Sequence, residues 1–179
     1  MRWLEDSLRP AKLCRMTTIA AWRDFFTACA GASAALAGLI FVALSVNIAQ
    51  ILKFEHLPAR AAAAVGALML ILTASLAVLA PQPPAWLGGE VLGLTFLAWL
   101  LQIGSARDSG AASRKYGRPT HEHVSEIVFG QAQMAPFAVG GVLLITGAEA
   151  GLAWLAAGAV TVFILSVVNA WVLLVEILR

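Results

Sequence analysis

The chain has 179 residues, of which 60% are hydrophobic and only 12% are charged, and its mean hydropathy is +0.84. A soluble domain carries about 25% charged residues, so this chain lacks the polar surface that would cover a globule in water. The formal net charge of +2 is small and gives no reason to expect a nucleic-acid partner.

The charged residues are clustered, and they leave charge-free runs of about the 20 residues that a helix needs to cross a bilayer. Backbone polar groups must be satisfied inside hydrocarbon, and the runs show no alternation of period two, so helices are expected rather than a barrel. We therefore expect an all-α, polytopic membrane helix bundle with five transmembrane helices in one domain, residues 28–179. The spans are expected at about residues 28–52, 61–80, 86–104, 127–146 and 152–175.

Residues 1–27 mix charges with aromatic side chains and are expected to lie at the membrane interface, with an early break at Pro10. Met16 is an alternative natural start, which would make residues 1–15 an upstream extension. In the first span, small residues recur at steps of four or seven, a spacing that lets a neighbouring helix approach closely and that would suit a homo-oligomer. This expected helix-packing face consists of Ala30, Ala34, Gly38, Ser45 and Ala49.

Proline and glycine residues predict where the later spans end, bend or turn. Pro81-Gln82-Pro83-Pro84 should end the second span, and residues 107–119 read as a long polar loop. Pro136 should kink the fourth span. Residues 147–151, which begin and end with glycine, should form a tight turn before the fifth span.

Five spans would place the first and third connecting loops on the same side as the C-terminus, and this side carries seven Lys or Arg residues. The N-terminal segment carries five, or only Arg23 if the chain starts at Met16. The positive-inside rule then favours an inner-membrane protein with its N-terminus outside and its C-terminus in the cytoplasm. If residues 1–15 are genuine, the bias is too small to fix this orientation.

Trp22-Arg-Asp-Phe-Phe26, followed by GASAALAGLIFVALSVN at residues 31–47, resembles the opening of a group of small, uncharacterised bacterial multi-pass membrane proteins. The resemblance covers about the first quarter of the chain and favours Met16 as the start. It implies no activity and no functional residues.

Side-chain amides gather near the expected cytoplasmic end of four spans. Amides do not titrate, so they would either bridge helices by hydrogen bonds or line a wet vestibule for an ion or polar solute. Bridging is favoured, because two of the residues lie two positions apart and point to different sides of one helix. The layer consists of Asn47, Gln50, Gln102, Gln131, Gln133 and Asn169.

Other chemistry is weakly supported. Glu90 is read as an interfacial carboxylate or, less favourably, as an acidic mouth for cations. His121 and His123 do not share a helix face, so no metal site is expected. Ser33 and Cys29 have no evident base, so no catalytic residue and no cofactor are expected.

The cationic loop residues would contact anionic lipid head groups or simply fix topology; they are Arg107, Arg114, Lys115 and Arg118. The expected function is a non-enzymatic structural or accessory bundle. The alternative is a small channel or transporter with a polar path near the cytoplasmic leaflet.

Overall fold

The structure is a computed structural model that describes residues 2–51, 57–116, 128 and 130–178. Every regular element in these ranges is a helix, which confirms the all-α prediction. The bounds are α1 Arg2–Val46, α2 Ile48–Ile51, α3 Leu57–Leu79, α4 Pro84–Tyr116, α6 Ala135–Ile145 and α7 Ala150–Leu178.

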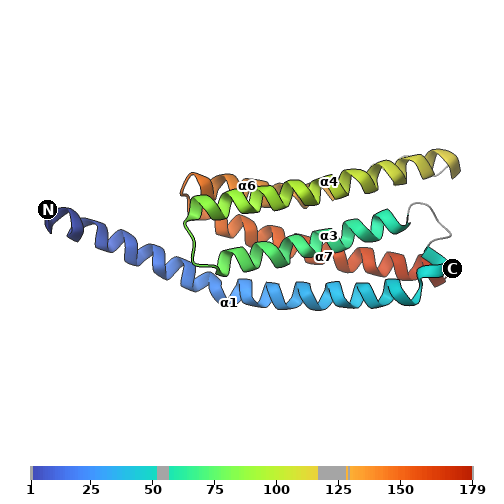
Figure 1. Ribbon diagram of the computed structural model, residues 1–179, viewed down its shortest axis with the longest axis horizontal. Helices are drawn as coiled ribbons and strands as arrows, with labels where there is room; N and C mark the ends of the chain where they lie inside the picture. Colours follow the sequence, from blue (N-terminus) through green and yellow to red (C-terminus); the bar gives the residue numbers. More distant parts are fainter. Residues whose placement is uncertain (1, 52–56, 117–127, 129, 179) are drawn as a thin grey trace.

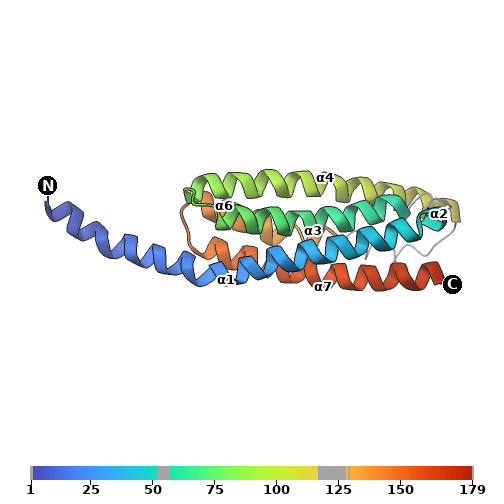
Figure 2. The same ribbon diagram turned by 60° about the horizontal axis from the view of Figure 1, so that its bottom comes forward.

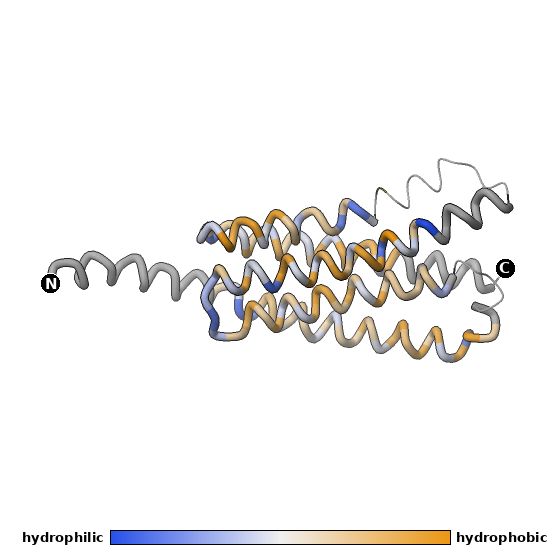
Figure 3. The backbone as a smooth tube through the Cα atoms, turned by 45° about the horizontal axis from the view of Figure 1, so that its top comes forward, coloured by the Kyte–Doolittle hydropathy of each residue, from blue (hydrophilic) through white to orange (hydrophobic). Residues whose placement is uncertain are grey.

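Four helical segments in the described ranges are long and apolar enough to cross a membrane: Ala21–Val46, Ala61–Leu79, Pro84–Arg107 and Ala150–Val168. They match four of the five predicted spans. The remaining predicted span, residues 127–146, corresponds to a shorter apolar helix, Gly130–Ile145. Hydrophobic residues run along the helices of the bundle, whereas hydrophilic ones gather near the helix ends (Figure 3).

The long helices run side by side and alternate in direction, and the two chain termini lie at opposite ends of the molecule (Figures 1 and 2). Helix α3 packs against α1 on one side and α4 on the other, and α6 lies between α4 and α7. Helix α7 also contacts α3 and α1, so the first and the last helix of the chain pack around a common core. The most deeply buried aliphatic side chains belong to α3, α4 and α7: Leu68, Ile71, Val91, Leu155 and Val162.

Two sequence predictions about helix limits were wrong. Pro10 does not break the N-terminal segment, because α1 is continuous from Arg2 to Val46 and projects beyond the bundle (Figure 1). Pro10 removes one helical N–H and its ring crowds the carbonyl four residues back, which costs about 3 kcal/mol, but its φ is helical, and α1 continues past it. The predicted loop after Arg107 is helical as far as Tyr116, since its Ala, Arg and Lys residues favour helix and one glycine costs only about 1 kcal/mol.

Two turns lie at the end of the bundle where α4 and α7 begin. Both occur where the sequence predicted them, at the prolines of residues 81–84 and at the glycine-bounded residues 147–151. Gly147 has φ +80°, and its N–H donates to the carbonyl of Leu144 while Ala148 N–H donates to that of Leu143. This is the Schellman arrangement, which places glycine in the left-handed conformation directly after a helix. Between α3 and α4, Gln82 Nε2 donates to Ala77 O (3.0 Å) and to Glu90 Oε2 (2.8 Å).

Candidate functional site

The polar side chains that meet across helices lie between α4 and the helical turn that precedes α6. Trp99 Nε1 on α4 donates a hydrogen bond to Gln131 Oε1, 32 residues further along the chain. One turn later on α4, Gln102 lies against Gly130, where an added Cβ would come within 3.4 Å of Gln102 Oε1. Trp99 and Gln102 are three residues apart and therefore share one face of α4.

A break in the helix lies next to this pair. The backbone turns at Gln133 and Met134, and α6 begins at Ala135 with Pro136 in its first turn. Met134 N–H donates to Gln131 O, which is one residue closer than in an α-helix. Because Pro136 has no N–H, it cannot donate to the carbonyl four residues back. The predicted kink at Pro136 is thus an interruption two residues ahead of the proline.

Gln133 lies inside this break and is 5% exposed. Its neighbour in the layer, Gln131, is half-buried and bonded to Trp99. Among the residues that the structure describes, none is hydrogen-bonded to the Gln133 side chain. A buried amide costs free energy unless it is hydrogen-bonded, and Phe129, four residues before Gln133, lies outside the described part of the structure.

The structure does not gather the whole predicted amide layer. Asn47 lies at the junction of α1 and α2, and its Nδ2 donates to Ala43 O on its own helix at 3.0 Å. Gln50 lies in α2 and Asn169 in α7, and their side chains fall outside the described part of the structure. Of the described amides, Gln102 and Gln131 belong to the same contact between α4 and residues 130–131, whereas Gln133 lies two residues further along.

The predicted small-residue face of α1 is not the face that packs within this chain. Ala30 is half-buried, and the other four members are exposed: Ala34, Gly38, Ser45 and Ala49. A Cβ added at Gly38 would meet nothing within 4 Å. Within residues 21–46 of α1, whose side chains the structure describes, the buried positions are Phe26, Cys29, Ser33 and Ala37. Their spacing of three and four residues places them on a different stripe of the same helix.

Close helix contacts are instead made by glycines of α4, α6 and α7. A Cβ added at Gly88 would lie 2.6 Å from the carbonyl oxygen of Gly141. One added at Gly140 would lie 3.0 Å from the carbonyl oxygen of Gly151. These glycines therefore let α6 approach both of its neighbours at backbone distance. The sequence signal was present in the pairs Gly88-Gly89 and Gly140-Gly141.

The aromatic motif near the start of the first span is a compact cluster. The ring centroids of Trp22 and Phe25 are 5.9 Å apart, and those of Phe25 and Phe26 are 5.3 Å apart, both in edge-to-face arrangements. Phe26 is 2% exposed and belongs to the common core. The motif thus fixes the entry of α1 into the bundle.

The remaining candidates add no reactive centre to the described site. Glu90 is exposed and accepts the hydrogen bond from Gln82 described above. No group of three or more His, Cys, Asp or Glu side chains that could hold a metal occurs among the described residues. His121 and His123, which were considered as metal ligands, lie outside them.

The cluster formed by Trp99, Gln102 and Gln131 offers hydrogen-bond donors and acceptors but no titratable group. It can join helices or hold a polar solute, but its own side chains cannot relay a proton or attack a substrate. Comparisons of the chain with protein-family models, with curated proteins and with solved structures find no match.

Proposed function

We propose that the protein is a non-enzymatic helix bundle of the bacterial inner membrane with a structural or accessory role. The observation that carries this proposal is that hydroxyl side chains in the helices are hydrogen-bonded to carbonyls of their own helix. The hydroxyls of Ser45, Thr73 and Thr95 each donate to a carbonyl four residues earlier on the same helix. Polar groups that are satisfied in this way present little to a passing solute.

The same proposal includes five spans, with residues 127–146 forming the fourth. An odd number of spans suits termini at opposite ends of the bundle, as in Figure 1. Of the sequence connecting the spans, residues 47–60 and 107–129 contain six Lys or Arg, whereas residues 80–83 and 146–149 contain none. We assign the cationic end to the cytoplasm on the positive-inside rule. A reporter fused after Arg179 should be active in the cytoplasm, and activity on the periplasmic side contradicts this topology.

A small channel or transporter is the second candidate, and the interrupted helix at Gln133 favours it. Transporters place their binding sites at interrupted helices within the membrane, where irregular backbone lines a cavity. The buried amide of Gln133 would be the polar contact for the solute. Helix bridging is the better-supported role for the amides, because Gln131 is already engaged by Trp99 and Asn47 by its own helix.

Flux measurements on purified protein in liposomes separate the two functions. The accessory role predicts that K⁺, Na⁺, Cl⁻ and proton fluxes equal those of protein-free vesicles, with an ionophore added last to show that the vesicles are sealed. The channel or transporter predicts a flux that Gln133→Leu abolishes and that Asn47→Ala leaves unchanged, because the Asn47 amide donates its hydrogen bond to Ala43 O on its own helix. A flux that behaves in this way overturns the accessory role.

A further inference from the structure

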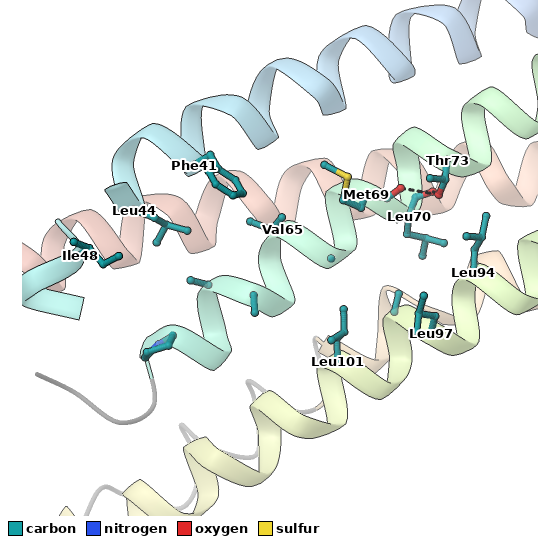
Figure 4. A pocket seen from close by; sticks show the side chains of 15 residues that line it. Phe41, Leu44, Ile48, Val65, Met69, Leu70, Thr73, Leu94, Leu97 and Leu101 are labelled. Carbon is teal, nitrogen blue, oxygen red and sulfur yellow. Dashed lines mark hydrogen bonds between the residues drawn. The ribbon is translucent and has the colours of Figure 1, made fainter. Parts of the chain in front are cut away.

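An apolar groove of about 620 Å³ opens on the side of the bundle between α1 and α4, and its floor is α3. Figure 4 shows Phe41 and Leu44 of α1 on one side and Leu97 and Leu101 of α4 on the other, with Val65 and Met69 of α3 between them. Helices α1 and α4 both pack against α3. The groove lies where the two diverge.

The lining selects an apolar occupant. Thr73 carries the one polar side chain among the lining residues, and its hydroxyl donates to Met69 O at 2.7 Å. The side chains of the lining therefore offer no free hydrogen-bond donor to a polar solute, and a water in the groove would find no side-chain partner to bind. Met69 adds a flexible thioether that adapts to the shape of a chain.

The dimensions suit a lipid tail. The floor runs from Pro58 in the first turn of α3 to Thr73, about 22 Å at 1.5 Å per residue. The walls, Phe41–Ile48 and Leu94–Leu101, are each about 10 Å long. One leaflet of the hydrocarbon is about 15 Å thick, so the groove reaches from one interface towards the bilayer centre, as an acyl chain does.

The two ends of the bundle differ in net charge. At the mouth of the groove, the first turn of α3 contains Arg60 and the end of α4 contains Arg107, Asp108, Arg114 and Lys115. With Glu176 near the end of α7, these helix ends carry four cations and two anions. The opposite end has Arg23 and Asp24 in α1, Glu90 in α4 and Glu149 before α7, and the preceding part of α1 adds four cations and two anions, so this end carries five of each sign. A negatively charged head group is therefore attracted to the mouth more strongly than to the other end.

We propose that this groove binds one acyl chain of an anionic phospholipid, whose head group lies at the cationic mouth. The competing occupant is a helix of a second copy. A helix is 10–12 Å across, and along the 22 Å floor it would need about 1,700–2,500 Å³. That is several times the volume of the groove, so a helix would rest on its rim rather than enter it.

The test is photo-crosslinking of the full-length protein in vesicles that contain a phospholipid with a diazirine on its acyl chain. Anionic phosphatidylglycerol is compared with zwitterionic phosphatidylcholine, and labelled peptides are identified by mass spectrometry. We expect the anionic lipid to label residues 41–48, 61–73 and 94–101 at least fivefold more than the zwitterionic lipid does, the size expected for one nearby cation. Equal labelling by the two lipids overturns the proposal without any variant.

Two matched variants separate the groove from the general lipid surface. Ala62→Trp fills the groove from α3, whereas Ala43→Trp places the same side chain on an exposed position of α1 that does not line it. We expect groove labelling to fall at least fivefold in Ala62→Trp and to be unchanged in Ala43→Trp. Equal labelling of the two variants, or crosslinks in the groove between two copies, refutes the proposal.

Arg60→Gln/Arg107→Gln should lower labelling by the anionic lipid at least fivefold and leave the zwitterionic lipid unaffected, while Arg23→Gln at the other end should change neither. A double variant that labels like wild type refutes the assigned head-group position and the proposal with it. A flux in the liposome assay described above would leave this site standing, so failure of the accessory role and failure of the lipid site are distinguishable.

Discussion

The contact between α4 and α6 at Gly88 gives the sharpest test of the packing. In a Gly88→Ala variant, the new Cβ would lie 2.6 Å from Gly141 O and 2.8 Å from both Ile145 N and Ile145 Cγ1. Two of these three atoms belong to the backbone, so no rotamer change relieves the overlap. To reach an ordinary 3.4 Å contact, Gly141 O would have to move by about 0.8 Å, which means that the two helices separate.

Overpacking of this kind costs about 1–3 kcal/mol, whereas Gly→Ala inside a helix gains up to about 1 kcal/mol in propensity. Gly89→Ala is a matched control, because it lies on the same helix and nothing is within 4 Å of its added Cβ. The two variants share the propensity gain, so their difference isolates the clash. We expect Gly88→Ala to be about 1–3 kcal/mol less stable than Gly89→Ala.

The assay is reversible unfolding in mixed micelles with increasing SDS, followed by far-ultraviolet circular dichroism. Both variants should have the same helix content before unfolding, and the midpoint of Gly88→Ala should come at lower SDS. If Gly88→Ala unfolds at or above the midpoint of Gly89→Ala, the backbone approach of α4 and α6 is not the contact described here.

Three further results are expected in the same assay. Trp99→Phe and Gln131→Leu should each destabilise the bundle, and a double-mutant cycle should return a coupling of about 0.6–1.7 kcal/mol for their hydrogen bond; zero coupling contradicts the contact. Gly147→Ala should cost about 1–2 kcal/mol because its φ of +80° is strained for alanine, and an unchanged midpoint contradicts that conformation. Phe26→Ala should cost about 3–5 kcal/mol and Phe41→Ala far less, since their side chains are 2% and 64% exposed; equal costs contradict the burial.

Hydropathy located the apolar helices well but could not assign their neighbours. A span is recognised by its length and composition, and four of the predicted spans overlap apolar helices, with limits that differ by at most seven residues. Which face of a helix meets protein is a different question, because lipid tails are as apolar as leucine and leave no hydrophobic pattern to read. For this reason the buried stripe of α1, at Phe26, Cys29, Ser33 and Ala37, was missed, although its residues are three and four positions apart.

The partners of the amides in the polar layer could not be predicted from the sequence, for a related reason. An amide in a membrane helix has two ways to be satisfied, by a neighbouring helix or by a carbonyl on its own helix, and the sequence does not distinguish them. Gln131 uses the first, through Trp99, and Asn47 uses the second, through Ala43. The partner Trp99 carried no signal of its own, because tryptophan near the end of a span is ordinarily read as an interface anchor.

The predicted packing face of α1 is mostly exposed in this chain, so whether it binds a second copy can be tested directly. Only 17% of the apolar α1 segment is buried, against 50% of the α3 segment, so α1 lies at the edge of the bundle with Gly38 exposed. If two copies meet through this face, a Gly38→Cys variant in a background without Cys14 and Cys29 should form a disulfide-linked dimer on mild oxidation of native membranes. Ala43→Cys is the matched control, because it is exposed on the same helix and about 140° around the axis from Gly38. Equal crosslinking of the two variants would mean random collision, and the small-residue spacing of α1 would then have no partner in a second copy.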